Sequence, residues 1–338
     1  MPSRQDERRE SKCRALYART ISSLPQSEPA AVSHMRAHVL AHLANHRARV
    51  SPGSTSPPLM VGFQGPQGSG KTYLSSLLAE TLRAPPHSLS VAVLSIDDLY
   101  LPHDGLVALA HAHPHNGLLK GRGQPGTHDL PLGLAVLNSL REINDGAARA
   151  VQLPRFEKSL HGGEGDRAEG GPVARPPLDV VILEGWCVGF YPIADGELER
   201  RWGRPVPGLG ADFLERRGFR GDDVREVNGL LRAYLPWWDC LQVCVQIKPE
   251  DAHPYTHIYK WRRQQEHHMK AQNGGKGMTD AQVEAFVDRY ILGYVFFGDG
   301  VTEGGVDSGG ETRRPPWLQR GQRIEIDENR EVVNVSEF

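Results

Sequence analysis

The residues most clearly suited to chemistry form a glycine-rich run, GPQGSGKT, at positions 65–72. The run matches the spacing G-x-x-x-x-G-K-[ST] of loops that wrap nucleotide phosphates. Glycine tolerates the dihedral angles that turn backbone N–H groups inward, and the next helix points its N-terminus at the anion. Lys71 is expected to reach the β- and γ-phosphates, and the Thr72 hydroxyl to ligate Mg²⁺. The sequence thus predicts an ATP-binding loop made of Gly65, Pro66, Gln67, Gly68, Ser69, Gly70, Lys71 and Thr72.

Three carboxylates lie at the ends of apolar runs that read as buried strands. Asp97 and Asp98 follow SVAVLSI (90–96), and Glu184 lies near the end of DVVILEGW (179–186). Ligands of a parallel sheet bind at the carboxyl ends of its strands, so Asp97 is predicted to accept the proton of an attacking hydroxyl. Glu184 is predicted to support Mg²⁺, which makes Thr72, Glu184 and Asp97 the candidate metal ligands. The alternatives are that the aspartates cap the following turn and that Glu184 is an exposed strand end.

Polar stretches between these strands are candidates for substrate recognition. The segment 113–133 is rich in glycine, and LPRFEKSLH (153–161) carries two cations that suit an anionic substrate. A long polar loop on a rigid scaffold often recognises a ligand, although a solvated connector has the same composition. The candidate substrate-binding residues are Asp98, Tyr100, Arg122, His128, Asp129, Arg155 and Lys158.

A basic segment, HIYKWRRQQEHHMK (257–270), has the pattern of a helix. In phosphotransferases a mobile helix bearing arginines closes over the phosphates and offsets the charge of the transition state. Arg262 and Arg263 are therefore predicted to act in catalysis together with Lys71 and Asp97. A solvated basic face is the alternative.

Strands and helices alternate along the chain. Apolar runs predict strands at 59–63, 90–96, 179–186, 241–247 and, as the last one, 323–326; helical spacing is found at 72–83, 130–142, 253–271 and 279–291. This alternation indicates an α/β fold with a mostly parallel central sheet between two helical layers.

The chain is predicted to divide near the breaker SPGSTSPP (51–58). Residues 1–55 are expected to form an N-terminal helical arm, because apolar residues recur at helical spacing up to about residue 50. Residues 56–338 are expected to form the nucleotide-binding domain. Gly- and Pro-rich stretches near 161–177 and 299–316 are interpreted as mobile loop insertions.

Composition narrows the possible partners. A formal charge of −2 over 338 residues gives no basic field for nucleic acid, and no run of 18 apolar residues predicts a membrane span. The start, MPSRQDERRESK, lacks the apolar core of a secretory signal. Four scattered cysteines fit a reducing compartment. We expect a cytoplasmic protein with a small-molecule substrate; the sequence does not indicate its oligomeric state.

Taken together, several segments resemble D-glycerate 3-kinase of plants and its fungal relatives, within the group containing uridine kinase, phosphoribulokinase and bacterial pantothenate kinase. The similarity rests on GPQGSGKT (65–72), LSIDDLYL (94–101), GRGQPGTHDLPLG (121–133), LPRFEKSLHGGEGDR (153–167), VILEGWCVGF (181–190), YKWRRQQEHHMK (259–270) and GMTDAQVEAFVDRY (277–290). The resemblance implies a three-layer α/β/α P-loop kinase fold. It also implies that Asp97 matches the catalytic base, Glu184 the Walker-B acid, and Arg262 and Arg263 the lid.

These observations predict an ATP- and Mg²⁺-dependent kinase that phosphorylates a hydroxyl of a small acid, with D-glycerate the leading candidate. Two alternatives stay open. The first is a kinase for another substrate, such as a nucleoside or pantothenate. The second is an ATP-dependent switch or assembly factor with little kinase activity. Against a GTP-dependent switch, the chain has no guanine-reading N-K-x-D motif.

Overall fold

The computed structural model describes residues 28–51, 55–146, 149–272 and 274–338. Its centre is a six-stranded sheet in the order β12-β11-β8-β1-β7-β2. All neighbouring pairs are parallel except β11 and β12. The strands are β1 Leu59–Gln64, β2 Val91–Ser95, β7 Val180–Gly185, β8 Val243–Pro249, β11 Gly321–Ile326 and β12 Val332–Glu337.

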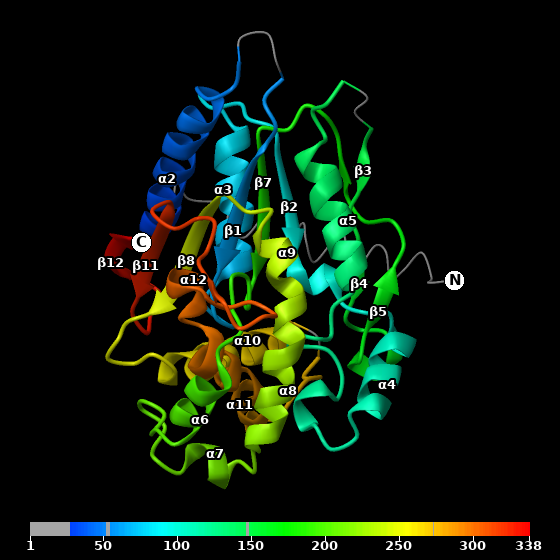
Figure 1. The fold of residues 1–338 in the computed structure, drawn as a ribbon, viewed down its shortest axis with the longest axis vertical. Helices are drawn as coiled ribbons and strands as arrows, with labels where there is room; N and C mark the ends of the chain where they lie inside the picture. Colours follow the sequence, from blue (N-terminus) through cyan, green and yellow to red (C-terminus); the bar gives the residue numbers. More distant parts are fainter. Residues whose placement is uncertain (1–27, 52–54, 147–148, 273) are drawn as a thin grey trace.

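Helices cover both faces of this sheet, as the sequence predicts (Figure 1). In the view of Figure 1, α3 lies behind the strands, α9 lies in front of them, and α5 lies beside β2 on the right. The chain is therefore an α/β protein with three layers. The covering helices are α2 Ala30–Arg47, α3 Lys71–Arg83, α5 Leu130–Arg141 and α9 Leu235–Trp238.

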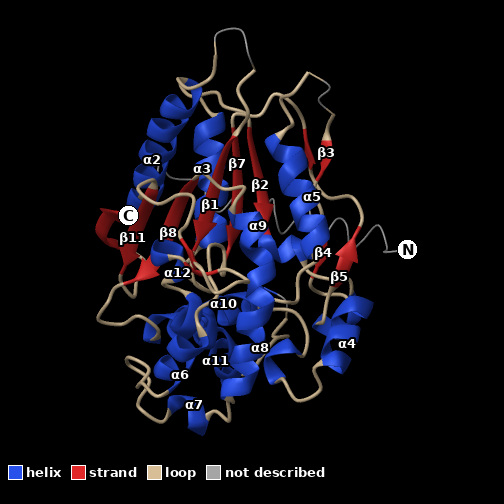
Figure 2. Ribbon diagram, viewed as in Figure 1, coloured by secondary structure: helices blue, strands red, loops and turns tan. Residues whose placement is uncertain are grey.

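A second group of helices lies beyond the carboxyl ends of the strands, in the lower half of Figure 2. The longest two, α10 Thr256–Gln272 and α11 Asp280–Phe297, pack against each other. A capping box between Thr279 and Gln282 fixes the start of α11. This group also includes α4 His103–Ala112, α6 Asp195–Trp202, α7 Phe213–Arg216 and α8 Gly221–Leu231.

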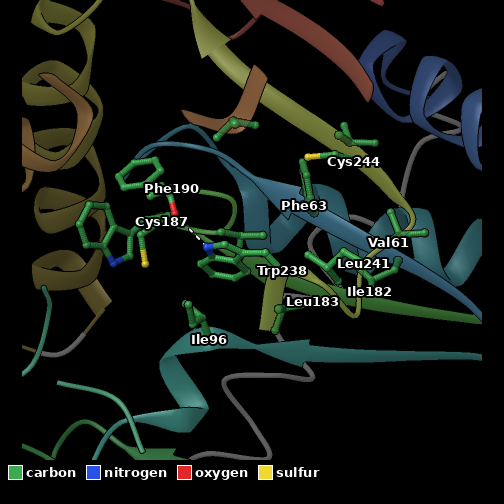
Figure 3. Close-up of a cluster of buried hydrophobic side chains, with 14 of the residues drawn as sticks. Val61, Phe63, Ile96, Ile182, Leu183, Cys187, Phe190, Trp238, Leu241 and Cys244 are labelled. Carbon is green, nitrogen blue, oxygen red and sulfur yellow. Dashed lines mark hydrogen bonds between the residues drawn. The ribbon is translucent and has the colours of Figure 1, made fainter. Parts of the chain in front are cut away.

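The apolar core fills the space between the sheet and its helices. Every residue of β1 and β7 is buried, which is typical of parallel strands covered on both faces. Phe63, Leu183 and Trp238 are among the side chains that meet there (Figure 3). The indole N–H of Trp238 donates to the Phe190 carbonyl at 2.8 Å, so this large ring is buried without an unpaired polar group.

The predicted helical arm lies partly outside the described residues, which begin at residue 28. The described part is α2, whose side chains Val32, Met35 and Val39 are fully buried. They pack among β1, β8, β11 and α3. This helix is therefore part of the layer that covers the sheet. A division into an arm (1–55) and a second domain remains a prediction.

The sequence-based element boundaries need three corrections. The strand at 323–326 is not the last, because β12 adds an antiparallel edge strand. It was missed because its residues are half exposed or exposed and so lack an apolar run. Helix α11 continues to Phe297, beyond the predicted end at 291.

The third correction concerns the insertions, which contain paired strands rather than loop alone. In the first, β5 Asp166–Ala168 pairs with β4 Arg155–Glu157, and β6 Val173–Ala174 pairs with β3 Val151–Gln152. The second holds α12 Gly300–Glu303 and the pair β9 Gly305–Val306 and β10 Thr312–Arg313. Backbone pairing across short polar strands leaves no apolar pattern to read.

In the described part of the chain, no helix has both the length and the apolar character that a membrane crossing needs.

Candidate active site at the carboxyl edge of the sheet

Strand register brings the three predicted chemical groups to one edge of the sheet. Glu184 on β7 lies opposite Phe63 on β1 and opposite Ser95 on β2. The glycine-rich loop starts two residues after Phe63, and Asp97 lies two residues after Ser95. The loop, Glu184 and Asp97 therefore meet where a doubly wound sheet binds its ligands.

The loop has the backbone shape that the motif predicts. Gly68 and Gly70 take positive φ angles of 76° and 86°, which other residues adopt only at a cost. The Ser69 hydroxyl donates to the Pro66 carbonyl at 2.7 Å and holds the loop closed. Helix α3 begins at Lys71, so its N-terminus faces the loop interior and favours an anion there.

Thr72 and Glu184 form a fitting pair of oxygen ligands for Mg²⁺. The Thr72 hydroxyl donates to Glu184 Oε1 at 3.4 Å. Glu184 is only 3% exposed, and its Oε2 has no hydrogen-bond partner among the described residues. A buried carboxylate oxygen without a partner is costly unless a cation joins it. Mg²⁺ commonly binds one or two protein oxygens together with substrate phosphates, and these residues suit that arrangement.

Asp97 is held by two side chains. Lys158 Nζ lies 2.5 Å from Asp97 Oδ2, and the Tyr100 hydroxyl donates to Oδ1 at 3.1 Å. Burial raises the pKa of Asp97, but the charges of Lys158 and Lys71 outweigh it and hold the pKa below its usual range. The same pairing raises the pKa of Lys158. Asp97 is therefore an anion with a cation directly beside it.

Asp98 faces a different group. Its carboxylate accepts the backbone N–H of Phe156 at 3.0 Å, and burial raises its pKa. This bond anchors β4 beside the 3₁₀ turn that carries both aspartates. The neighbouring Arg155 pairs with Glu157 at 3.2 Å. In this structure Asp98 positions the hairpin that presents Lys158, and Arg155 contacts an acid of its own strand.

Tyr100 and His128 form a buried stack behind Asp97. Their rings lie 4.4 Å apart at 16°, and each residue is 2% exposed. The Tyr234 hydroxyl accepts the N–H of Gly126 at 2.8 Å and lies 2.6 Å from His128 Nδ1. It can therefore donate to Nδ1, which leaves the histidine proton on Nε2. Burial lowers the pKa of His128 to about 4, so this ring supports Tyr100 as a neutral group.

Arg122 and Asp129 brace the β4–β5 hairpin, whose loop carries Lys158. Arg122 Nη1 donates to the carbonyls of Gly163, at 2.6 Å, and Glu164. Asp129 caps α5 through the N–H of Leu132 at 3.0 Å and pairs with Arg167 at 3.0 Å. The structure thus brings Asp97, Tyr100, Lys158 and Arg122 together and places Asp129 at the base of the insertion.

The two predicted lid arginines do not reach the loop in this structure. Arg262 pairs with buried Glu266 at 2.9 Å, and its guanidinium lies 5.3 Å from the Phe286 ring. Arg263 lines a cavity of about 470 Å³ together with Tyr259 and Arg217. Arg263 is two residues beyond Trp261, about 200° further around α10, so its side chain and the cavity lie on nearly the opposite side of the helix from the Trp261 side chain, which a Cβ at Gly68 would meet. A catalytic role for both arginines remains a prediction.

Three residues that the sequence did not single out hold the site together. The Tyr294 hydroxyl accepts the N–H of Gln67 at 3.1 Å. Arg330 Nε donates to the Gly68 carbonyl at 2.8 Å. Arg167 Nη2 donates to the Tyr100 carbonyl at 2.7 Å. Only Arg167 carried a signal, because it lies in one of the segments that resemble a known family. The other two reach the site from α11 and from the turn after β11.

Known proteins resemble this chain over most of its length. The probable ATP-dependent kinase TDA10 of Saccharomyces cerevisiae is 37% identical over 246 residues, which are 71% of this chain and 78% of that protein. The chloroplastic D-glycerate 3-kinase of Arabidopsis thaliana is 34% identical over 255 residues, 75% of this chain; the match spans 50% of the plant protein. No family model matches the chain.

A solved structure has the same fold. The D-glycerate 3-kinase from Cryptococcus neoformans var. grubii superposes with a TM-score of 0.82 at 38% sequence identity. The superposition covers 92% of this chain and 100% of the other. The resemblance therefore extends over most of this chain and over the whole of that structure.

Proposed function

The chain belongs to the D-glycerate 3-kinase family with its fungal relatives among the P-loop kinases, and we propose that it phosphorylates D-glycerate to 3-phosphoglycerate. Its activity is an ATP-dependent transfer of phosphate to an alcohol group of a small molecule. The finer identity of the acceptor is our proposal. The observation that carries it is Lys158 beside Asp97 at 2.5 Å, which puts an anion-binding cation next to a proton acceptor.

In the proposed reaction the residues of the loop, Gly65 to Thr72, hold the triphosphate. Backbone N–H groups and the α3 N-terminus face the phosphates, and Lys71 bridges the β- and γ-phosphate oxygens. Thr72 and Glu184 would hold Mg²⁺, and Asp97 lies at the same edge of the sheet. When bound, the metal offsets negative charge on the γ-phosphate.

Asp97 acts on the acceptor. Its carboxylate takes the proton of the substrate hydroxyl while that oxygen bonds to the γ-phosphorus and the bond to the β-phosphate oxygen breaks. ADP leaves with the electron pair of the broken bond. Tyr100 holds the aspartate in place, and Lys158 and Arg122 make the acceptor side of the site cationic.

The test is ADP release by purified protein with Mg·ATP, with and without D-glycerate. We expect large, saturable stimulation with 3-phosphoglycerate as the product. Lys71→Ala should abolish it while the circular dichroism spectrum stays unchanged; full activity would refute the assigned role of the loop. Asp97→Asn should lower kcat by roughly 100-fold or more with ATP affinity retained, the range for a lost general base.

A panel of other acceptors separates the alternatives. Stimulation by a nucleoside or pantothenate instead of glycerate would keep the kinase and change the substrate. ADP release that responds to no small alcohol would favour a nucleotide-dependent switch.

A further inference from the structure

Both oxygens of the proposed base are occupied before any substrate arrives. Asp97 Oδ1 accepts the Tyr100 hydroxyl, and Oδ2 contacts Lys158 Nζ. Each carboxylate oxygen can accept a second hydrogen bond, but a proton placed on Asp97 while Lys158 stays beside it would leave that ammonium group without its anionic partner. One of the two partners must therefore move or share its oxygen during the reaction.

Tyr100 is poorly suited to move. It is 2% exposed, stacked on His128 and in edge contact with Phe156 at 5.3 Å between ring centroids. Its ring could leave only by opening the packing behind Asp97, which close-packed interiors resist.

Lys158 is suited to move. Its side chain is 53% exposed, and within the described residues Asp97 is its one ion-pair partner. Its backbone follows β4, which Asp98 anchors through Phe156. A flexible four-carbon stem on a fixed hairpin can swing its ammonium group while the hairpin stays in place.

Charge decides what could draw Lys158 away. A neutral alcohol offers no anion, so the ion pair with Asp97 stays and the base remains blocked. A hydroxy acid brings its own carboxylate, which can replace Asp97 as the partner of the ammonium group. Arg122 adds a second positive charge close by. Its partners among the described residues are the carbonyls of Gly163 and Glu164 and the ring of Phe156, which are neutral and do not offset that charge.

We propose that Lys158 gates the base: it releases Asp97 only when the carboxylate of the acceptor takes its place. Acid substrates are thus selected by activating the base as well as by binding. This inference rests on the proposed function in one respect, the assignment of Asp97 as proton acceptor. It extends that function by naming the residue that recognises the acid and by linking this recognition to the release of the base.

The exchange conserves charge. The ammonium group moves from one carboxylate to another, and both stay ionised. The freed Oδ2 of Asp97 then accepts the hydroxyl proton as the new O–P bond forms, and ADP departs with the electrons of the cleaved bond.

The experiment compares Lys158→Met, Lys158→Arg and the native protein on matched acceptors: D-glycerate with glycerol, and glycolate with ethylene glycol. We expect the native protein to prefer the acid in each pair. In Lys158→Met the ratio of kcat/KM values should fall roughly 10- to 100-fold, the usual range for a lost charged hydrogen bond. The neutral member should keep or gain activity, because its base is no longer blocked. Lys158→Arg should retain the preference.

Lys276→Met is the matched control, because Lys276 is an exposed lysine in the turn between α10 and α11. It should leave both ratios unchanged. An unchanged acid preference in Lys158→Met would overturn the gating inference while leaving the kinase assignment intact. Equal losses on acids and neutral alcohols would mean a structural role for Lys158 and would also overturn it.

Failure of the gating inference can be distinguished from failure of the proposed function. Native protein stimulated by glycolate or another hydroxy acid, but not by D-glycerate, would refute the proposed substrate and support the gate. Native protein that prefers the neutral alcohols, or responds to no hydroxy acid, would refute both.

Discussion

At the scale of single residues, two adjacent aspartates have different surroundings. Asp97 faces Lys158 and the Tyr100 hydroxyl, whereas Asp98 accepts the N–H of Phe156. The pKa of Asp97 is shifted down and that of Asp98 up. The difference follows from geometry: a 3₁₀ turn, Ile96–Leu99, points consecutive side chains in different directions. Such pairs of shifted carboxyls are typical of functional sites.

Tyr100→Phe tests whether the hydroxyl positions Asp97. The ring and its stacking on His128 remain, so the fold should be retained. Loss of one hydrogen bond to a charged group is expected to lower kcat by roughly 10-fold, with ATP affinity unchanged. Steady-state kinetics and calorimetric ATP binding measure the two effects. Equal losses in kcat and ATP affinity would contradict a role specific to Asp97.

His38 predicts a pH dependence of stability. It is 6% exposed in α2, and burial, followed by the charge of His42, lowers its pKa from 6.5 to about 4. Between these values the unfolded chain binds a proton that the folded chain does not. The contribution of neutral His38 to the free energy of unfolding is therefore fully present above about pH 6.5. It is lost as the pH falls toward 4, by on the order of 3 kcal/mol.

The measurement is urea unfolding between pH 7.5 and 4.5. His38 Nε2 lies 3.2 Å from the Arg320 carbonyl oxygen. His38→Gln should reduce this pH dependence, because glutamine cannot take up the proton and can still donate a hydrogen bond to that carbonyl. The buried His128 shifts in the same direction, so part of the slope should remain. A slope identical to that of the native protein would contradict the prediction.

At the scale of elements, the glycine-rich loop and α10 are in direct contact. A side chain at Gly68 would place its Cβ 2.6 Å from Trp261 Cβ and 3.0 Å from the Trp261 backbone. Gly70 has an equally unusual φ, but a Cβ added there would have no neighbouring atom within 4 Å. The two glycines are thus required for different reasons, one for space and backbone conformation and the other for conformation alone.

Gly68→Ala and Gly70→Ala form a matched pair. Each should lose about 1 kcal/mol of stability to its left-handed backbone. Gly68→Ala should lose about 1–3 kcal/mol more, since α10 must move away from the loop. Thermal and chemical denaturation without nucleotide report this difference. Equal losses would show that α10 adjusts freely.

At the scale of the whole molecule, the C-terminal hairpin closes on the nucleotide loop. The turn after β11 carries Arg330, which donates to the Gly68 carbonyl and to Gln264 Oε1 at 3.1 Å. Its guanidinium lies 5.5 Å from the Trp261 ring. Residues more than 250 positions apart in the chain therefore meet where the loop, α10 and the C-terminal hairpin come together.

Arg330→Met should weaken that contact. We expect a loss of about 1–2 kcal/mol in stability, for one hydrogen bond and one partly buried cation–π contact, together with weaker ATP binding. Denaturation and calorimetry measure these, and Val333→Ser, an exposed position on β12, is the control. Unaltered ATP affinity would mean that Arg330 stabilises the hairpin but does not contribute to ATP binding.

The sequence by itself determined the elements that carry a local pattern. The apolar runs predicted five sheet strands, and the spacing at 65–72 predicted the phosphate loop, because burial on both faces and a tight glycine turn each restrict residue type locally. The family could also be identified from the sequence, because each of its motifs is an unbroken run of residues. The edge strand β12 and the hairpins of the first insertion lack an apolar pattern and were missed.

Only the tertiary structure decided which side chains meet. Asp97 and Lys158 are far apart in the chain, and nothing in their spacing shows that they lie 2.5 Å apart. The same holds for Tyr294 and Arg330, which reach the loop from α11 and the C-terminal hairpin. Arg262, equally basic in sequence, pairs with Glu266 instead. Residue type and spacing limit what a side chain can do, whereas packing of distant elements determines its partner, and here that partner sets whether the proposed base is free.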